Sequence, residues 1–328
     1  MSIPDIKYCP GTLAKGYDTY SRACLNRVFD KRRVSHVLPY DAPATSEPTD
    51  EPYFENQQHI SISGVQVKFS VLLEKNKLRL TREGEQGTYL IKPEPAGVKN
   101  ADQMPANEHL IMQIAQQVFN IETAANALIF FKNGMSAYIT KRFDVNENRG
   151  KWATEDFASL AEITPQTHGS HYKYLGNYLE LFHLMQQRLP AYGTEAPKLY
   201  RLIAFNYLFS NGDAHFKNFS LIENPQGDFR LSPAYDLLNS HIHINDSDFA
   251  LEEGLLPKNM ASGKVMQQFL LLAEHAGLAR KQTQKIWNDL LSGKDKVAAL
   301  VEASFLNEKT KRNYFQAYQA KYNKLTRD

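Results

Sequence analysis

The chain has 328 residues, of which 42% are hydrophobic and 23% charged, and its 38 basic and 36 acidic side chains nearly balance. Such a chain is long enough for two lobes, and its composition excludes disordered, fibrous and strongly basic nucleic-acid-binding proteins. It contains no apolar stretch long enough to cross a bilayer and no signal-peptide pattern, so we expect a cytoplasmic protein that binds neither membranes nor nucleic acids directly.

The first part of the chain, residues 1–58, carries few structural signals. Residues 1–38 are basic and aromatic, whereas residues 39–58 contain four prolines and five acidic residues, which indicates a linker attached to the lobe that follows. The chain's two cysteines, Cys9 and Cys24, lie in this part. They are too few for a zinc site or a secreted disulfide scaffold, so we expect reduced thiols.

The next part, residues 59–143, is predicted to be an N-terminal lobe with the order strand, strand, strand, helix, strand, strand. Alternating and β-branched residues indicate the strands, an Asn-Gly turn joins the last two, and apolar residues at helical spacing indicate the helix. The predicted strands are residues 60–73, 77–80, 88–92, 127–131 and 136–140, and the predicted helix is residues 107–119.

Residues 144–328 are predicted to be a mainly helical lobe. Residues 172–188 and 197–210 carry apolar side chains at i, i+3 and i+4 spacing, and the last 65 residues have the pattern of several packed helices. A short hairpin, residues 219–222 and 229–232, interrupts the helices. A β-rich lobe followed by a helical lobe makes an α+β protein and is typical of the two-lobed protein-kinase fold.

The strongest functional motif lies just before this hairpin. Asp213 and Asn218 are five residues apart, which is the spacing of the kinase catalytic loop, where the Asp is the catalytic base and the Asn binds Mg²⁺. His215 would anchor the loop, and Lys217 would neutralise charge on the transferred phosphate. A polar loop that merely caps the preceding helix is the alternative, which the position between an amphipathic helix and a hairpin disfavours.

Three further residues complete a predicted site for ATP and Mg²⁺. Asp236 lies just past the hairpin, where a kinase places another Mg²⁺ ligand, although a helix N-cap would also explain an Asp there. Lys92 ends a strand and is predicted to contact the phosphates, with Glu108, 16 residues further along, as its ion-pair partner. The alternative is an ordinary strand-end Lys and a solvated helical Glu.

Two more segments are predicted to bind the nucleotide. Between the lobes, Lys141 and Phe143 would offer backbone groups to adenine and Asp144 would reach the ribose, unless this is only a strand end with a surface ion pair. Residues 60–68 take the position of the phosphate-binding loop but hold one glycine instead of three, which is a weak signal. The residues of this loop predicted to contact the nucleotide are Ser63, Gly64, Val65, Gln66 and Lys68. Two serines are candidates for autophosphorylation, Ser61 and Ser63, and the alternative is that they are ordinary turn and strand serines.

Together these segments resemble the HipA-like serine/threonine kinases, which are toxins of bacterial toxin–antitoxin systems. The matching segments are residues 61–66 with Lys68, 89–93, 107–108, 141–144, 211–220 and 235–238. The resemblance implies that Asp213 is the catalytic base and that Asn218 and Asp236 bind Mg²⁺. It also implies that Lys92 binds the phosphates and that Ser61 is a regulatory serine.

Two departures favour the compact HipT branch of three-gene HipBST systems. The residues before the kinase core are too few for the N-terminal subdomain of longer members, and Ser63 stands where those members have a small apolar residue. The resemblance implies that the missing subdomain is a separate small antitoxin protein, with a DNA-binding antitoxin as a further partner. It also implies an aminoacyl-tRNA synthetase as substrate, tryptophanyl-tRNA synthetase in the nearest branch.

The sequence thus predicts a serine/threonine protein kinase toxin that uses ATP and Mg²⁺ and is silenced by phosphorylation of Ser61 and Ser63. A phosphoserine carries roughly −1.5 to −2 charges and would repel the phosphates of ATP. Two alternatives stay open, a small-molecule kinase of related fold and a non-catalytic pseudokinase held in a regulatory complex. The intact set of predicted ATP-site residues argues against the pseudokinase.

Overall fold

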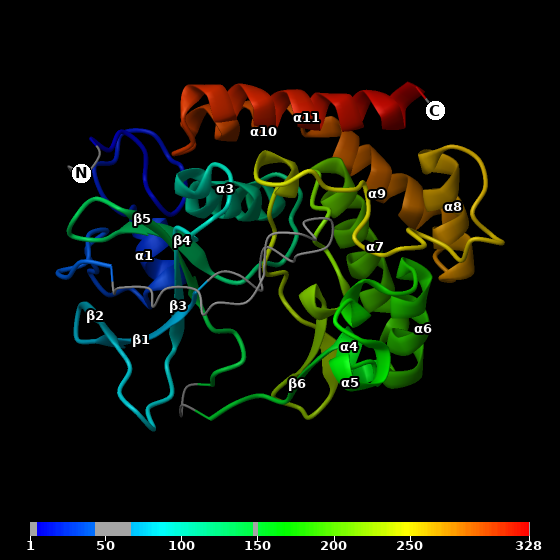
Figure 1. The fold of residues 1–328 in the computed structure, drawn as a ribbon, viewed down its shortest axis with the longest axis horizontal. Coiled ribbons are helices and arrows are strands. Elements are labelled where there is room, and N and C mark those ends of the chain that lie inside the picture. The colour runs from blue at the N-terminus through cyan, green and yellow to red at the C-terminus, as the bar shows by residue number, and fades with distance from the viewer. Residues whose placement is uncertain (1–4, 43–66, 147–149, 328) are drawn as a thin grey trace.

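The computed structural model describes residues 5–42, 67–146 and 150–327, which fold into two lobes (Figure 1). One lobe is built on a five-stranded antiparallel sheet with the strand order β2-β1-β3-β5-β4. The predicted strands are confirmed to within a few residues, although the start of the first one lies outside the described residues. The strands are β1 (Phe69–Glu74), β2 (Lys77–Leu80), β3 (Tyr89–Pro93), β4 (Asn126–Phe130) and β5 (Ser136–Lys141).

Helix α3 (Met104–Gln117) follows the turn η1 (Ala101–Gln103) and packs against β4 and β5. Its first twelve residues are all buried, because the sheet covers one side and α10 (Lys294–Ala303) contacts another. It begins at Met104 rather than at residue 107, with Pro105 in the first turn, where a missing N–H leaves no hydrogen bond unmade. The hydrophobic core around α3 continues into the helical lobe.

Residues 5–42 are part of the core of the sheet lobe. Helix α1 (Arg22–Val28) and the two cysteines, which are buried free thiols, pack with residues of the sheet. Next to β4 the chain adds a parallel edge: Leu38 N–H donates to Phe130 O and Phe130 N–H donates to His36 O, both at 2.8 Å. Backbone pairing between such distant segments has no local sequence signal, so the sequence did not predict it.

The helical lobe is centred on α6 (Tyr178–Arg188) and α7 (Tyr192–Leu208), which pack against each other. The helix predicted over residues 172–188 is confirmed from Tyr178 on and is wrong before it. Gly176 has a φ of 78°, which ends any helix there, so the turn η2 (Tyr172–Tyr174) is separate from α6. This break sets the direction of Tyr174, which matters for the site.

A three-stranded sheet lies in the same lobe, with the order β6-β7-β8. The β7 (Ser220–Glu223) and β8 (Phe229–Leu231) hairpin was predicted, whereas β6 (Thr154–Asp156) is too short to show a period. The short helices α4 (Phe157–Leu160) and α5 (Pro165–His168) follow β6. The hairpin fixes the end of the predicted catalytic loop on one side and the start of the segment with Asp236 on the other.

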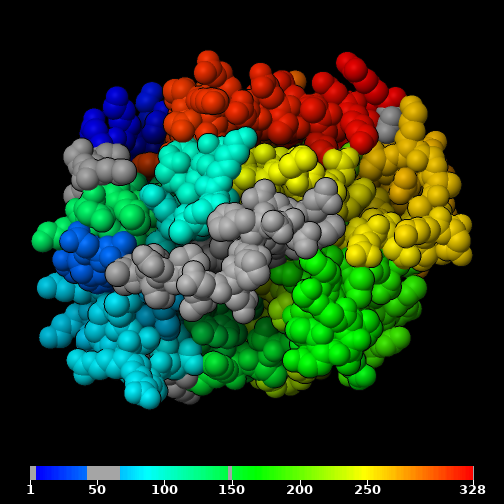
Figure 2. All heavy atoms as spheres, viewed as in Figure 1, coloured from blue at the N-terminus to red at the C-terminus, as the bar shows by residue number. Residues whose placement is uncertain are grey.

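The C-terminal helices connect the two lobes. They are α8 (Val265–His275), α9 (Arg280–Ser292), α10 and α11 (Glu308–Arg327). Helix α10 contacts α3 and α11 contacts α7, and the space-filling view shows α10 and α11 along one edge of the molecule beside both lobes (Figure 2). Among the described residues, no helix combines the length and apolar character that crossing a membrane requires.

Candidate active site

Lys92 on β3 lies between two carboxylates. Its Nζ donates a hydrogen bond to Glu108 Oε1 on α3 at 2.6 Å and another to Asp236 Oδ1. The side chains of Lys92 and Glu108 are each only 4% exposed. The predicted contact between Lys92 and Glu108 is therefore present, and Asp236 joins it to form one buried cluster.

Burial and charge act against each other in this cluster. Burial by itself would lower the pKa of Lys92, but Asp236 and Glu108 outweigh it and raise that pKa. Burial raises the pKa of Glu108 despite the attraction of Lys92. Around Asp236, the effect of burial is outweighed by Lys92 and Lys68, which lower its pKa to about 2. Asp236 is thus ionised at neutral pH and able to bind a metal cation.

Backbone pairing across the lobes brings Asp236 to Lys92. Ala124 N–H donates to Ala234 O at 2.9 Å, and Ala234 N–H donates to Glu122 O at 2.8 Å. These bonds hold the segment just before Asp236 against the end of the α3–β4 connection. Asp236 itself has a φ of 53°, a left-handed conformation that is uncommon for residues other than glycine.

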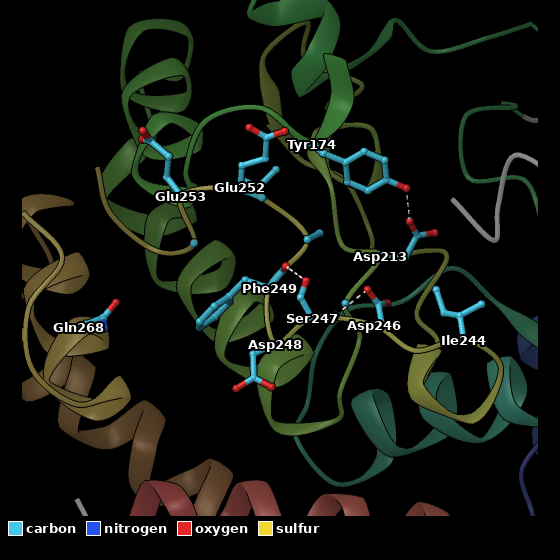
Figure 3. A pocket seen from close by; sticks show the side chains of 14 residues that line it. Tyr174, Asp213, Ile244, Asp246, Ser247, Asp248, Phe249, Glu252, Glu253 and Gln268 are labelled. Carbon is cyan, nitrogen blue, oxygen red and sulfur yellow. Dashed lines mark hydrogen bonds between the residues drawn. The ribbon is translucent and has the colours of Figure 1, made fainter. Parts of the chain in front are cut away.

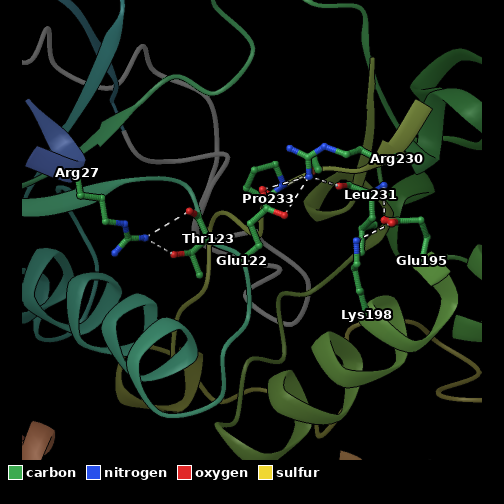
Figure 4. A network of polar contacts seen from close by, with 9 residues as sticks. Arg27, Glu122, Thr123, Glu195, Lys198, Arg230, Leu231 and Pro233 are labelled. Carbon is green, nitrogen blue, oxygen red and sulfur yellow. Dashed lines mark hydrogen bonds and ion pairs between the residues drawn. The ribbon is translucent and has the colours of Figure 1, made fainter. Parts of the chain in front are cut away.

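Side chains from both lobes support this pairing (Figure 4). Arg27 Nη2 on α1 donates to Thr123 Oγ1 at 2.7 Å. From the other lobe, Arg230 on β8 pairs with Glu122 at 3.0 Å. The connection between α3 and β4 is therefore held from two sides, and the position of Asp236 depends on it.

Asp213 lies in the loop between α7 and β7, and its side chain is 10% exposed. The Tyr174 hydroxyl donates to Asp213 Oδ1 at 2.8 Å, and His215 Nε2 lies 3.8 Å from the same oxygen. Burial, reinforced by Lys173, lowers the pKa of His215 to about 3, so the imidazole is neutral near pH 7. A carboxylate with one oxygen held by a hydroxyl is suited to accept the proton of a substrate hydroxyl.

Asn218 ends the turn η3 (Phe216–Asn218) and is buried. Its Oδ1 is enclosed and accepts no hydrogen bond from any described residue. Tyr235 OH donates to Lys217 O at 2.8 Å, which ties this turn to the segment that carries Asp236. An amide oxygen and a carboxylate are ligands that Mg²⁺ takes. Because the described residues contain no cluster of three His, Cys, Asp or Glu side chains that could hold a metal, phosphate oxygens and water would supply the other ligands.

Lys217 is placed differently from the expectation. Its Nζ pairs with Asp156 Oδ2 at 2.8 Å, where β6 ends. The ammonium is therefore already engaged by a carboxylate of the protein, and a role on the transferred phosphate requires this ion pair to open. That role stays a prediction.

Lys173 and Tyr174 are site residues that the sequence did not indicate. Burial lowers the pKa of Lys173, while Asp213 acts in the opposite direction. Lys173 Nζ lies 5.2 Å from the centre of the Tyr174 ring. Both residues were assigned to the first turn of a helix, and only the break at Gly176 lets them approach the candidate catalytic loop.

The backbone N–H of Lys141, one of the groups predicted to meet adenine, is already bonded within the sheet lobe. Its N–H donates to Ala125 O at 2.7 Å beside the β4–β5 pairing, and its ammonium pairs with Asp30 at 2.6 Å. The Lys141 N–H is therefore not available to a nucleotide, whereas a contact through the Lys141 carbonyl stays a prediction. The surface ion pair that the sequence left as the alternative is present at this strand end.

Phe143 and Asp144 follow β5 as expected, but their environment is now defined. The Phe143 ring centre lies 5.6 Å from that of Tyr235. Asp144 receives two hydrogen bonds from Arg142, including one from Nε to Oδ1 at 2.9 Å. A contact between Asp144 and a ribose stays a prediction.

The structure describes only the end of the segment predicted to be the phosphate-binding loop. Lys68 Nζ lies 3.9 Å from Asp236 Oδ2, whereas Lys92 binds the other oxygen of the same carboxylate. Five predicted residues lie outside the described part of the chain, namely Ser61, Ser63, Gly64, Val65 and Gln66.

Comparison with known sequences identifies the family. The sequence profile of the HipA-like C-terminal domain matches residues 60–297, which is more than half of the chain. The chain belongs to the HipA-like C-terminal domain family. The predicted family is thus confirmed, whereas the narrower likeness to the HipT branch stays a prediction.

Curated relatives of this HipA-like chain share about a quarter of its sequence. A Haemophilus influenzae protein named "Putative kinase" is 24% identical, and the match covers 88% of this chain and 87% of that protein. Two similarly named Sinorhizobium fredii proteins, Y4dM and Y4mE, are 28% and 26% identical over 68% and 55% of this chain. Those two matches span 55% and 42% of the relatives' own lengths.

Solved structures show the fold of the HipA-like chain. A structure of the Shewanella oneidensis toxin–antitoxin system with HipA, HipB and operator DNA matches with a TM-score of 0.63 and 18% identity, over 88% of this chain and 74% of that one. The Helicobacter pylori proinflammatory kinase CtkA matches with a TM-score of 0.52 and 12% identity, over 79% of this chain and 95% of that one. The predicted α+β kinase-like fold is confirmed.

A cavity of about 700 Å³ opens beside the candidate catalytic loop of this HipA-like domain (Figure 3). Gly212, Asp213 and Tyr174 form one wall, and residues 246–254, which follow the turn η4 (Ser240–Ile242), form most of the rest. The Asp213 carboxylate and the Tyr174 hydroxyl face each other at its edge (Figure 3). The cavity therefore lies where a substrate hydroxyl would approach the candidate base.

Proposed function

We propose that this protein is an ATP-dependent kinase that phosphorylates a serine or threonine of a protein substrate. The observation that carries the proposal is the buried contact of Lys92 with both Glu108 and Asp236. Phosphoryl transfer needs a cation on the phosphates, metal ligands and a carboxylate that orients the acceptor. The described residues supply these groups in the kinase order, which also argues against a pseudokinase.

The proposed roles follow from the positions of the side chains. When bound, ATP with Mg²⁺ supplies the phosphoryl group and the positive charge that stabilises it. Lys92 would bind the phosphates, and Asn218 and Asp236 would hold the metal. Asp213 would accept the proton of the substrate hydroxyl at Oδ2, while Tyr174 keeps Oδ1 in place.

We further propose that the protein is a toxin of a toxin–antitoxin system that acts in the cytoplasm on an aminoacyl-tRNA synthetase. Autophosphorylation of Ser61 and Ser63 would regulate it. The fold shared with Shewanella oneidensis HipA, whose structure contains HipB and operator DNA, supports an antitoxin as partner. The partners would be a small antitoxin protein and a DNA-binding antitoxin.

Transfer from radiolabelled ATP to proteins of a cell lysate tests the proposal. The wild-type chain and a Glu302→Gln control, changed on an exposed residue of α10, should label a protein band, whereas Asp213→Asn should not. Mass spectrometry of the incubated protein would show whether Ser61 or Ser63 carries phosphate. Label in a low-molecular-weight product would instead indicate a small-molecule kinase, and failure to bind Mg-ATP together with absence of label would refute both.

A further inference from the structure

Lys173 is a cation of the candidate site that has no role in the proposed mechanism so far. It lies in the turn η2, and its Nζ is 5.2 Å from the centre of the Tyr174 ring. The hydroxyl of that ring donates to Asp213 Oδ1 at 2.8 Å. The ring also packs edge-on against the imidazole of His215, with 5.1 Å between the ring centres. Lys173 therefore lies beside the aromatic side chain that orients the candidate base.

The backbone that carries Lys173 is held against the candidate catalytic loop. The turn η2 contacts η3, which ends at the candidate metal ligand Asn218. On another side, Glu252 N–H donates to Tyr174 O at 2.9 Å. Lys173 itself is partly buried. Packing of the turn thus limits the directions that its side chain can take.

Lys173 differs from the other cations of the site because it lacks a carboxylate partner. Lys92 and Lys68 both pair with Asp236. Lys217 is engaged in its own ion pair at 2.8 Å. No ion pair joins Lys173 to a carboxylate of residues 5–42, 67–146 or 150–327. A partly buried ammonium without an anion is unfavourable, and a bound anion would relieve that cost.

The charges around Lys173 come from both lobes. Burial lowers the pKa of Lys173, Asp213 acts in the opposite direction, and Lys217 and Lys68 lower it further. Lys68 precedes β1 in the sheet lobe, whereas Lys173 and Lys217 belong to the helical lobe. Three ammonium groups thus gather in one region that also contains Asp213. Their repulsion would be relieved by an anion with several charged oxygens.

We propose that Lys173 is a further catalytic residue, whose ammonium binds the phosphoryl group during its transfer from ATP to the substrate hydroxyl. The inference rests on the proposed kinase function and deepens it. In the transfer, the acceptor oxygen bonds to the γ-phosphorus while the bond from that phosphorus to the β–γ bridging oxygen breaks. ADP leaves with the electron pair of the broken bond, and Asp213 takes the proton of the hydroxyl. Lys173 keeps its own proton and donates a hydrogen bond to an oxygen of the transferred group.

Lys173 suits this role better than Lys217, for which the sequence predicted it. Lys217 would first have to leave Asp156. The Lys173 ammonium has no ion pair to break within the described part of the chain. A donor that is in place before the reaction, and needs no rearrangement during it, stabilises the transition state most effectively.

Two variants of the full-length protein separate the charge of Lys173 from its packing. Lys173→Met keeps an apolar stem without the ammonium, and it should lower the maximal rate of label transfer from ATP to lysate proteins about 100-fold. Lys173→Arg should restore most of this loss, because a guanidinium also donates hydrogen bonds to phosphate. The KM for ATP should change less than about twofold in both variants, since Lys92 and Lys68 are unchanged. Lys281→Met, on an exposed position of α9, is the control and should keep the wild-type rate.

Binding of Mg-ADP with and without aluminium fluoride, measured by calorimetry, gives a second readout that needs no turnover. Aluminium fluoride resembles the phosphoryl group in flight, so it should tighten the binding of ADP to the wild-type chain. Lys173→Met should lose at least about tenfold of this gain in affinity, with the affinity for Mg-ADP alone unchanged. Lys173→Arg, Lys217→Met and Lys281→Met should keep most of the gain.

The two readouts separate a catalytic role from a structural one. An unchanged rate and an unchanged aluminium fluoride gain in Lys173→Met would overturn the proposal, and so would a loss of the gain in Lys217→Met alone. Equal rate losses in Lys173→Met and Lys173→Arg with the gain intact would show a merely structural role and would also overturn it. A wild-type chain that neither binds Mg-ADP nor transfers label would instead refute the proposed kinase function.

Discussion

Removal of one hydroxyl, in Tyr174→Phe, tests how Asp213 is oriented. The Tyr174 hydroxyl donates to Asp213 Oδ1 at 2.8 Å from a buried ring. A hydrogen bond to a charged group contributes about 1.5–3 kcal/mol, and about 1.4 kcal/mol corresponds to a tenfold change in rate. If this bond holds Asp213 in its reactive orientation, kcat should fall roughly 10- to 100-fold.

Steady-state kinetics separates orientation from general damage. The KM for ATP should change less than about twofold, because the Lys92 cluster keeps all its contacts. Tyr192→Phe is the matched control, since it also loses a donating hydroxyl in a partly buried position. The acceptor of Tyr192 is a backbone oxygen, Ala276 O at 2.7 Å, and not a carboxylate. Its kcat should stay at the wild-type value. An unchanged kcat in Tyr174→Phe, or an equal loss in both variants, would refute the orienting role.

Three further substitutions test the Lys92 cluster, the buried His109 and the loop that carries Asp213. Lys92→Met leaves the buried carboxylate of Glu108 without its cation and Asp236 with only Lys68 at 3.9 Å. Urea titration should therefore show a loss of about 3–5 kcal/mol in unfolding free energy, against less than about 1 kcal/mol for the exposed Lys285→Met. Equal losses would contradict the buried cluster. Burial lowers the pKa of His109 to about 4, so the unfolded state binds the proton first as pH drops. Stability should therefore fall from about pH 6.5 towards 4, by about 1.6 kcal/mol between pH 6.5 and 5. His109→Gln should make that dependence less steep by the share of His109, while His215, whose pKa is also lowered by burial, keeps its own share. An unchanged slope would show that His109 does not contribute. Gly212→Ala places a Cβ 2.5 Å from a backbone oxygen, so the loop must move and the rate of phosphoryl transfer should fall at least about tenfold. Gly193→Ala, in open space on α7, is the control and should keep activity. Full activity of Gly212→Ala would contradict a rigid loop.

Much of the fold could be predicted because its signals are local. Residue alternation, an Asn-Gly turn and one helical period indicate β1 to β5 and α3, and the β7–β8 hairpin has a clear turn. The failures are non-local. The edge formed by residues 36–40 depends on Phe130, and β6 depends on β7, so neither segment shows its conformation in its own sequence.

The same contrast between local and non-local signals decides which residues of the candidate site could be predicted. Lys92 and Glu108 could be paired from sequence, because a strand end and the next helix leave few other positions for them. Tyr174 could not be assigned, because its contact with Asp213 requires the chain to leave the helix at Gly176. The cavity beside Asp213 was also missed, because Asp246 and its neighbours belong to an irregular segment without periodicity.

Asp236 shows how tertiary contacts replace a local preference. Its left-handed φ of 53° costs on the order of 1–3 kcal/mol for a residue other than glycine, so the segment by itself would not favour this conformation. The ion pair with Lys92 and the two backbone bonds of Ala234 offset that cost. Because Ala234 is bonded to Glu122 and Ala124 in the sheet lobe, the same contacts that hold the lobes together also place the candidate metal ligand. A change that separates the lobes at this point should therefore move Asp236 away from Lys92 and weaken metal binding before it unfolds either lobe.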